Sequence, residues 1–174
     1  MIIRDNYALL PETESYTVPT GTGPNDWGVD IDSEYWKHFK EGKCVLSLWF
    51  STNKPFDKKV TLGVYMRAHP WYKIGSIDYP ANTSQLMKFE FKWDTNEAPD
   101  NYSANQFFIR FYKEEHGGIM FSMREDKIEI GDDSTPYIPN KNDVEPENKA
   151  IFPIGGGIQG SVSTLGQEGV GYVS

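Results

Sequence analysis

The chain has 174 residues, which is enough for one domain with a substantial core and too few for two comfortable ones. Its formal net charge of -8 disfavours nucleic acid, because phosphate binding needs a cationic surface, and it disfavours an anionic membrane surface as well. No apolar run approaches the roughly 20 residues of a spanning helix, and Met1–Asp5 lacks the charged-then-apolar order of a signal peptide. We therefore expect a protein made in a cytoplasm, with neither nucleic acid nor a membrane as its partner.

The N-terminal part predicts two short strands and one helical turn. Ser15–Val18 and Trp27–Ile31 are the strands, in a region otherwise broken by prolines and glycines. Ser33–Glu41 is the segment that predicts a helical turn, with Ser33 as its cap and Gly42 as its stop.

From residue 43 onward, apolar residues recur with a period of two, which is typical of strands that face a core on one side. The pattern is clearest in residues 85–93, where lysines and a glutamate alternate with apolar side chains. The other predicted strands are residues 43–51, 60–67, 105–113, 119–123 and 126–130. The side chains that we expect to form the core together are Met87, Phe89, Phe91, Trp93, Leu46, Leu48, Phe107, Ile109 and Phe111.

Turn-forming segments separate these strands. They are Asn53–Pro55, His69–Pro70, Tyr79–Asn82, Asn96–Asn101 and His116–Gly118. Short strands spaced by such turns predict an antiparallel sandwich, and the strand lengths suit a jelly roll. The expected fold class is therefore all-β, an antiparallel β-sandwich of jelly-roll type over residues 1–138.

Residues 139–174 predict an extended, Pro/Gly-rich C-terminal assembly arm. The prolines that keep this region from pairing as a central strand are Pro136, Pro139, Pro146 and Pro153. The glycines from Gly155 to Gly171 lose much conformational entropy on ordering and bring few side chains to offset that loss. The side chains spaced to enter pockets on other chains are Tyr137, Ile151, Phe152, Ile154, Ile158, Val162, Leu165 and Val170. We therefore expect the arm to be ordered by contact with other chains.

No catalytic residue is expected from the motifs. The histidines His38, His69 and His116 are far apart in the sequence and lack metal-ligand spacing. Cys44 is the only cysteine, and its apolar strand predicts a small buried side chain. The carboxylates in the predicted turns neither exclude nor indicate a glycoside hydrolase, which needs a pair of such groups. They are Asp78, Asp94, Glu97 and Asp100.

The best candidate site is an aromatic and polar cluster within residues 65–82. Tyr65 and Arg67 share the strand face opposite the apolar one, and aromatic residues follow in the predicted turns on either side of Asp78. Flat rings beside hydrogen-bonding side chains suit a saccharide; the alternative is that the rings pack against the sandwich edge or another subunit. The candidate carbohydrate-binding residues are Tyr65, Arg67, Trp71, Tyr72, Asp78, Tyr79 and Asn82.

A family resemblance lies in the stretch from Lys127 to Pro139. It reads as an alternating strand, then Gly131, which permits a sharp turn, then a short polar turn and Thr-Pro-Tyr-Ile-Pro. This order resembles the closing segment of carbohydrate-binding-module-like domains in tail and baseplate proteins of phages of Gram-positive bacteria. Tyr7–Leu10 and Asp26–Gly28 loosely echo the opening of that family.

The resemblance implies a non-enzymatic structural protein of a phage virion, a tail, baseplate or neck component that joins neighbouring subunits through its arm. Its partners would be other virion proteins and copies of itself in a homo-oligomer. The alternative is a host-attachment module that binds cell-wall polysaccharide. We expect no cofactor; a structural Ca²⁺, common in the resembled sandwiches, is the alternative, and its oxygen ligands would come from Asp30, Asp32, Glu129 and Asp132.

Overall fold

The computed structural model describes residues 1–11, 14–38, 41–67, 72–98 and 105–143. The chain divides into two units, Met1–Pro139 and Asn140–Ser174. The second unit is described only from Asn140 to Asp143, where it contains the short helix η3 (Lys141–Asp143). Of the residues assigned to the assembly arm, Tyr137 lies in the described range and is half-buried, whereas those from Ile151 to Val170 lie outside it.

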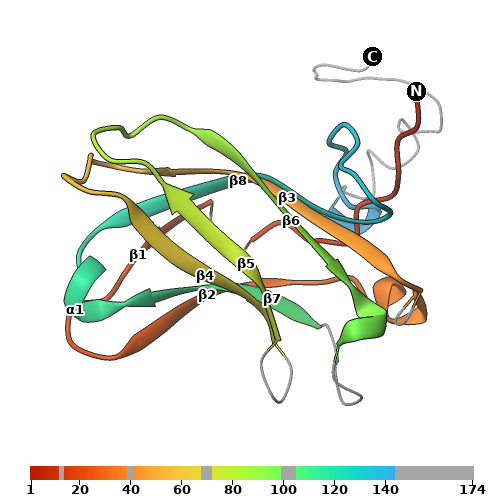
Figure 1. The fold of residues 1–174 in the computed structure, drawn as a ribbon, viewed down its shortest axis with the longest axis horizontal. Coiled ribbons are helices and arrows are strands. Elements are labelled where there is room, and N and C mark those ends of the chain that lie inside the picture. The colour runs from red at the N-terminus through yellow and green to blue at the C-terminus, as the bar shows by residue number, and fades with distance from the viewer. Residues whose placement is uncertain (12–13, 39–40, 68–71, 99–104, 144–174) are drawn as a thin grey trace. The chain divides into compact units, whose positions relative to one another are not determined.

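Two four-stranded antiparallel sheets form the unit Met1–Pro139 (Figure 1). One sheet has the order β1-β8-β3-β6 and the other the order β2-β7-β4-β5. The strands are β1 (Ser15–Thr17), β2 (Pro24–Asp30), β3 (Lys43–Thr52), β4 (Val60–Met66), β5 (Tyr72–Tyr79), β6 (Met87–Asp94), β7 (Gln106–Tyr112) and β8 (Met120–Ile130). The chain changes sheet at every connection except β4–β5, which is the strand order of a jelly roll. The predicted fold class is therefore confirmed.

The core lies between the two sheets and follows the alternation of the strands. In β6, Phe91 and Trp93 are buried, while Met87 and Phe89 are partly buried and pack against the core. The partners expected from the neighbouring strands are all buried; they are Leu46, Leu48, Phe107, Ile109 and Phe111.

β5 is a strand that was not predicted from the sequence; it lies between the predicted turns His69–Pro70 and Tyr79–Asn82. The register between β4 and β5 shifts between Val64 and Tyr65, so that one residue of β5 is left without a partner. As a result the buried residues Ile74 and Ile77 are three positions apart instead of two. Because the sequence does not alternate through this bulge, the strand was missed.

β8 joins two strands that the sequence predicts separately, residues 119–123 and 126–130. Its register with β3 shifts between Ser47 and Trp49, and Glu125 takes a left-handed φ of 52° at that point. The bulge changes which face the later residues point to, so that Met123 and Ile128 both face the core.

The helical segments are short. The predicted helical turn is the 3₁₀ helix η1 (Ser33–His38), in which Tyr35 is fully buried. A second 3₁₀ turn, η2 (Thr95–Glu97), follows β6, and α1 (Lys113–His116) joins β7 to β8 where a turn was predicted. None of the helices in the described part of the chain has the length and hydropathy of a membrane span.

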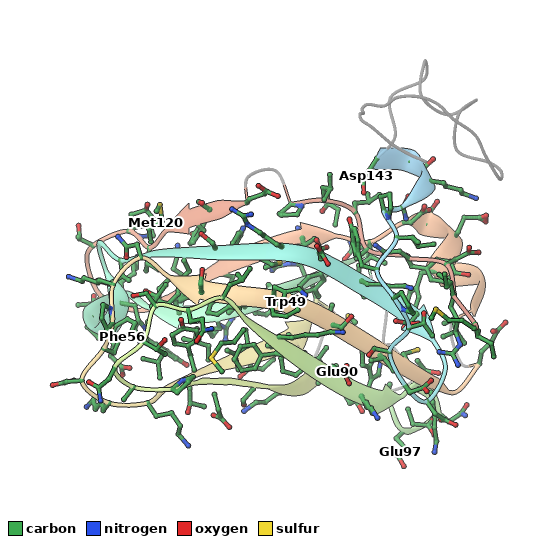
Figure 2. The ribbon with its side chains drawn as sticks, turned by 90° about the horizontal axis from the view of Figure 1, so that it is seen from above. Trp49, Phe56, Glu90, Glu97, Met120 and Asp143 are labelled. Atoms are coloured by element: carbon green, nitrogen blue, oxygen red, sulfur yellow. The ribbon has the colours of Figure 1, made fainter. Side chains whose placement is uncertain are left out.

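The N-terminal segment closes one end of the sandwich. The Tyr7 amide donates to the Ile128 carbonyl of β8 (2.9 Å), while the Leu9 amide donates to the Asp30 carbonyl of β2 (3.0 Å). The segment therefore bonds to both sheets. Figure 2 looks onto the sheet β1-β8-β3-β6, with Trp49 of β3 and Glu90 of β6 labelled on it.

Candidate functional site

The outer face of the sheet β2-β7-β4-β5 carries a cluster of aromatic, basic and acidic side chains. Strand pairing places them in three rows across the sheet. The first row is Asp30, Gln106 and Arg67; the second is Gly28, Phe108, Tyr65 and Lys73; the third is Asp26, Arg110, Gly63 and Ser76. We call this set the outer platform.

Two stacked rings form the centre of the outer platform. Tyr65 and Phe108 are cross-strand neighbours whose rings lie 5.2 Å apart between centroids and only 11° from parallel. A Cβ atom on Gly63 would come within 2.6 Å of the Tyr65 ring, so this glycine lets the tyrosine lie down along the sheet. Phe108 is fully buried although it points away from the core, whereas Tyr65 remains partly exposed.

Two guanidinium groups cover the rings. Arg67 lies over Phe108, with its guanidinium carbon 4.5 Å from the ring centroid. Arg110 lies 5.2 Å from Phe108 and 5.4 Å from Tyr65. Such cation–π contacts let the basic groups lie flat, so the rings and the charges form one surface.

Acidic and amide groups hold the guanidiniums in place. Arg110 forms a two-point ion pair with Asp26, at 2.9 and 3.0 Å, and this hydrogen bond raises the pKa of Arg110. Arg67 donates from Nε to the Gln106 side-chain carbonyl at 2.5 Å, and Gln106 donates in turn to Asp30 at 3.1 Å. A Cβ on Gly28 would come within 2.6 Å of the Gln106 side chain, so the absence of a side chain at Gly28 gives Gln106 the room to lie across the sheet.

The outer platform therefore offers a partly exposed ring bordered by fixed hydrogen-bonding groups. A sugar ring has an apolar C–H face that stacks on such a ring and hydroxyls that bond to the groups around it.

The structure brings together only part of the predicted carbohydrate-binding set. Tyr65 and Arg67 lie side by side on the outer platform. Trp71 lies outside the described residues. Tyr72 pairs with Met66 and packs against the core, and burial is the main cause that raises the pKa of its hydroxyl.

The other predicted residues lie at the far end of the β4–β5 hairpin. Asp78 is exposed and accepts from Thr61 (2.9 Å), about 20 Å along the strand from Arg67 at about 3.3 Å per residue. Tyr79 is fully buried, and its hydroxyl donates to the Gln85 carbonyl (2.6 Å). Asn82 is exposed in a turn with a φ of 61°. Saccharide binding by this far group stays a prediction.

Of the outer platform, the predicted carbohydrate-binding set includes only Tyr65 and Arg67. The charged, amide and aromatic side chains around them were missed; they are Asp26, Lys73, Gln106, Phe108 and Arg110. The alternation of residues 105–113 puts Phe108 and Arg110 on one face of their strand, but the pairing of β7 with β4 is not visible in the sequence. That pairing joins residues about forty positions apart, and no local pattern encodes it. The signal available in the sequence was the alternation in β7, which puts Phe108 on the strand face opposite to that of Phe107 and Ile109.

A second polar cluster lies where the chain leaves the sandwich, on the outer face of β8. Lys127 and Glu129 are both fully buried there, with Nζ and Oε1 3.8 Å apart. Lys127 donates to the Thr135 hydroxyl (2.9 Å) and to the Pro136 carbonyl (2.7 Å), and burial lowers its pKa. Glu129 accepts from the Thr135 hydroxyl (2.6 Å) and amide (3.1 Å).

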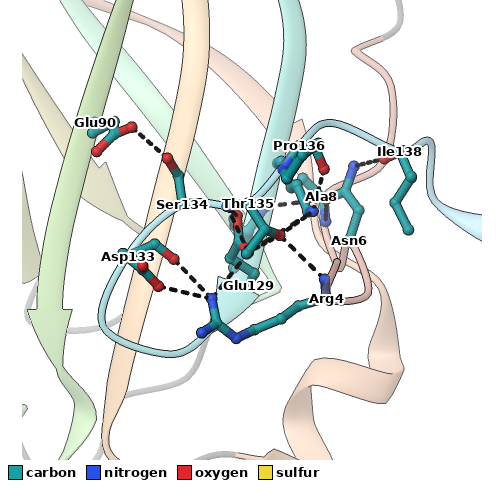
Figure 3. A network of polar contacts seen from close by, with 12 residues as sticks. Arg4, Asn6, Ala8, Glu90, Glu129, Asp133, Ser134, Thr135, Pro136 and Ile138 are labelled. Carbon is teal, nitrogen blue, oxygen red and sulfur yellow. Dashed lines mark hydrogen bonds and ion pairs between the residues drawn. The ribbon is translucent and has the colours of Figure 1, made fainter. Parts of the chain in front are cut away.

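The N-terminal segment completes this cluster (Figure 3). The Arg4 amide donates to the Thr135 hydroxyl (3.1 Å), and its guanidinium bonds to the Asp133 carbonyl (2.9 Å). A Cβ on Gly131 would come within 2.6 Å of the Arg4 guanidinium, and Gly131 has a φ of 152°, so a glycine is required here.

Asn6 adds the last bonds. Its amide nitrogen donates to the Asp126 and Ile138 carbonyls, both at 3.0 Å, and its oxygen accepts from the Ala8 and Ile128 amides. We call the set Arg4, Asn6, Lys127, Glu129, Thr135 and Pro136 the clasp. It gives a physical role to the Thr-Pro sequence on which the family resemblance rests.

A hollow of about 470 Å³ opens beside the start of β3. Its lining residues are Lys43, Cys44, Lys92, Trp93, Asp94, Glu97, Gly131 and Asp132. Burial raises the pKa of the Cys44 thiol to about 11, so the thiol stays protonated and is a poor nucleophile at neutral pH.

The acids considered as Ca²⁺ ligands have other partners. Asp32 caps the Glu34 amide (2.9 Å), Glu129 belongs to the clasp, and Asp132 lies 3.8 Å from the Lys43 ammonium. Within the described ranges, no three His, Cys, Asp or Glu residues lie together as a metal site requires.

Comparison with known proteins finds similarity only among solved structures, since no family model and no curated protein matches the chain. An arabinose-bound GH51 α-L-arabinofuranosidase matches at 16% identity and TM-score 0.49, over 66% of this chain and 18% of that chain. A CBM4 structure matches at 13% identity and TM-score 0.41, over 66% of this chain and 81% of that chain.

The tripod from the baseplate of bacteriophage Tuc2009 matches at 16% identity and TM-score 0.48, over 81% of this chain and 60% of that chain. The similar structures thus include carbohydrate-binding modules and a phage baseplate protein, the two kinds of protein that the sequence resemblance names. The TM-scores of these three structures lie below 0.5, so the similarities do not assign a function.

Proposed function

We propose that this chain is a non-enzymatic structural component of a phage virion, in the tail, baseplate or neck. The observation that carries the proposal is the segment from Lys127 to Pro139, which resembles the closing segment of virion domains. In the structure this segment supplies Lys127, Glu129, Thr135 and Pro136 to the clasp, which ties the end of the sandwich to Arg4 and Asn6 near its beginning. The clasp fixes the point from which the arm starts.

In this proposal the arm after Pro139 joins the sandwich to neighbouring subunits, which are other virion proteins or copies of the same chain. The apolar residues along the arm, such as Phe152 and Leu165, enter pockets on those neighbours. Because the clasp and the core lie within Met1–Pro139, we expect the sandwich to fold without the arm.

Deletion of residues 141–174 tests this function. The truncated protein should fold but should be absent from purified particles assembled in its presence, whereas the full chain should be incorporated. Substitution of Phe152 and Leu165 by serine in the full chain is the finer test, since it keeps the length of the arm. Normal incorporation of the truncated protein would disprove the proposed role of the arm.

The outer platform favours a second candidate function, binding of a saccharide on the host cell surface. The observation that carries it is Tyr65, a partly exposed ring held flat on the sheet by Gly63 and backed by Phe108. A ring fixed in this way loses little entropy when a sugar stacks on it.

A glycan array with the full chain tests the second function. Tyr65→Ala should abolish binding of any glycan that the wild type retains, while the protein stays folded and loses only about 1 kcal/mol of stability with the Tyr65–Phe108 stack. Trp49→Ala is the matched control, because Trp49 is a partly exposed aromatic residue on the outer face of the other sheet. If Trp49→Ala abolishes binding and Tyr65→Ala does not, the outer platform is the wrong face.

A further inference from the structure

The charges around Tyr65 are not balanced. Arg110 is neutralised by Asp26, whose two carboxylate oxygens lie 2.9 and 3.0 Å from its guanidinium. Arg67 also approaches Asp26, but only to 3.9 Å, on an oxygen that already accepts from Arg110. Among the described residues no other acid forms an ion pair with Arg67.

The nearest acceptor of Arg67 is neutral. Its Nε donates to the Gln106 amide oxygen, which carries no charge. The nearby Asp30 carboxylate instead accepts a hydrogen bond from the Gln106 side-chain nitrogen. The side chain of Arg67 is 38% exposed, so donors of its guanidinium are open to a ligand that rests on the outer platform.

A second cation lies on the neighbouring strand. Lys73 of β5 is the cross-strand neighbour of Tyr65, and it is exposed. Adjacent strands lie about 4.8 Å apart, so a side chain as long as lysine can reach the space above the Tyr65 ring. Tyr65 therefore has Arg67 two residues along its own chain and Lys73 on the adjacent strand, in a protein whose net charge is -8.

We propose that the ligand of the outer platform is an anionic saccharide. The inference rests on the second function proposed above. A sugar ring stacks on Tyr65, and a carboxylate or phosphate group of the saccharide accepts hydrogen bonds from Arg67 and Lys73. A guanidinium suits both anions, because its parallel N–H groups match two oxygens of either one.

Binding of the full chain to three polymers with one backbone tests the inference: dextran, carboxymethyl-dextran and dextran phosphate. At least one of the two charged polymers should bind more tightly than dextran, by about tenfold or more. A tenfold difference in affinity corresponds to about 1.4 kcal/mol. The two charged polymers distinguish a carboxylate from a phosphate ligand. Equal affinities for all three polymers, including no measurable binding, would overturn the inference.

Arg67→Gln should remove most of the preference for the charged polymer. Arg124→Gln is the matched control, since it removes the same charge from an exposed position on the other sheet and should leave the preference unchanged. Equal losses in the two variants would show that net charge alone sets the preference, against the proposal. The melting temperature of each variant checks that the sheet is intact.

Oligo(dT) is the competing ligand, because a nucleic acid also offers phosphates and stacking bases. Binding of oligo(dT) more tightly than dextran phosphate would reject a saccharide as the ligand. Failure of this inference and failure of the saccharide function are distinguishable on the glycan array. If only neutral glycans bind, and their binding depends on Tyr65, the anionic ligand is wrong and the saccharide-binding function stands. If no glycan on the array binds, both proposals are wrong.

Discussion

His116 is a histidine enclosed by aromatic rings. It is 6% exposed, and the ring centroids of Phe56, Phe111 and Phe121 lie 5.9, 6.3 and 6.1 Å from its own. Burial lowers its pKa from the ordinary value of 6.5, and the nearby carboxylate of Glu115 opposes this only in part. The folded protein therefore holds His116 in its neutral form.

The free energy of unfolding should consequently fall as the pH drops below 6.5, because the unfolded chain then binds a proton that the folded chain does not accept. Above that pH, His116 is neutral in both the folded and the unfolded state, and it no longer contributes to the pH dependence of the free energy of unfolding. Urea unfolding between pH 7.5 and 5 measures the change, and His116→Gln should flatten it. An unchanged pH dependence in the variant would mean that other groups cause the fall.

At the scale of elements, the clasp relies on a buried ion pair. The ammonium of Lys127 is removed from water and balanced by Glu129 and two oxygen acceptors. Removing one partner of a buried ion pair leaves the other charge without compensation, which typically costs about 3–5 kcal/mol.

Lys127→Met should therefore lower the free energy of unfolding by about 3–5 kcal/mol, as measured by urea denaturation at pH 7. Lys88→Met is the control: Lys88 lies on the same sheet, its side chain is 40% exposed, and the change should stay within about 0.5 kcal/mol. A similar small effect for Lys127→Met would show that Arg4, whose guanidinium lies 3.5 Å from the Glu129 carboxylate, compensates that charge without Lys127.

The strands were predictable where alternation is unbroken. In β6, Phe91 and Trp93 alternate with charged residues, and they are buried as expected. Prediction failed at the two bulges. Ile74 and Ile77 in β5 are out of phase with each other, and so are the two halves of β8 on either side of Glu125.

The outer platform was predictable only in part, for a related reason. Tyr65 and Arg67 share a face of one strand, which the period of two shows directly. Their partners Asp26 and Gln106 come from strands that are far away in sequence. Which strand lies beside which depends on how the whole core packs, so the composition of the face required the fold.

At the scale of the whole molecule, the unit Met1–Pro139 contains the core and the clasp. Deletion of residues 141–174 should therefore leave the melting temperature within about 4 °C of the full chain, since less than about 1 kcal/mol is expected to change. Differential scanning calorimetry on both proteins checks this. A large drop would show that the arm stabilises the sandwich, and the assembly experiment would then need the Phe152 and Leu165 variants instead.

The clasp has a mechanical consequence. The backbone at Arg4 and the side chain of Thr135 are directly bonded, and Asn6 is bonded to Ile138, so the two ends of the sandwich unit meet at one corner. A pulling force applied to the chain on both sides of the unit would load these few bonds first and would bypass the sheets. Under such a force the corner would yield first, while the outer platform, on the other sheet, kept its shape.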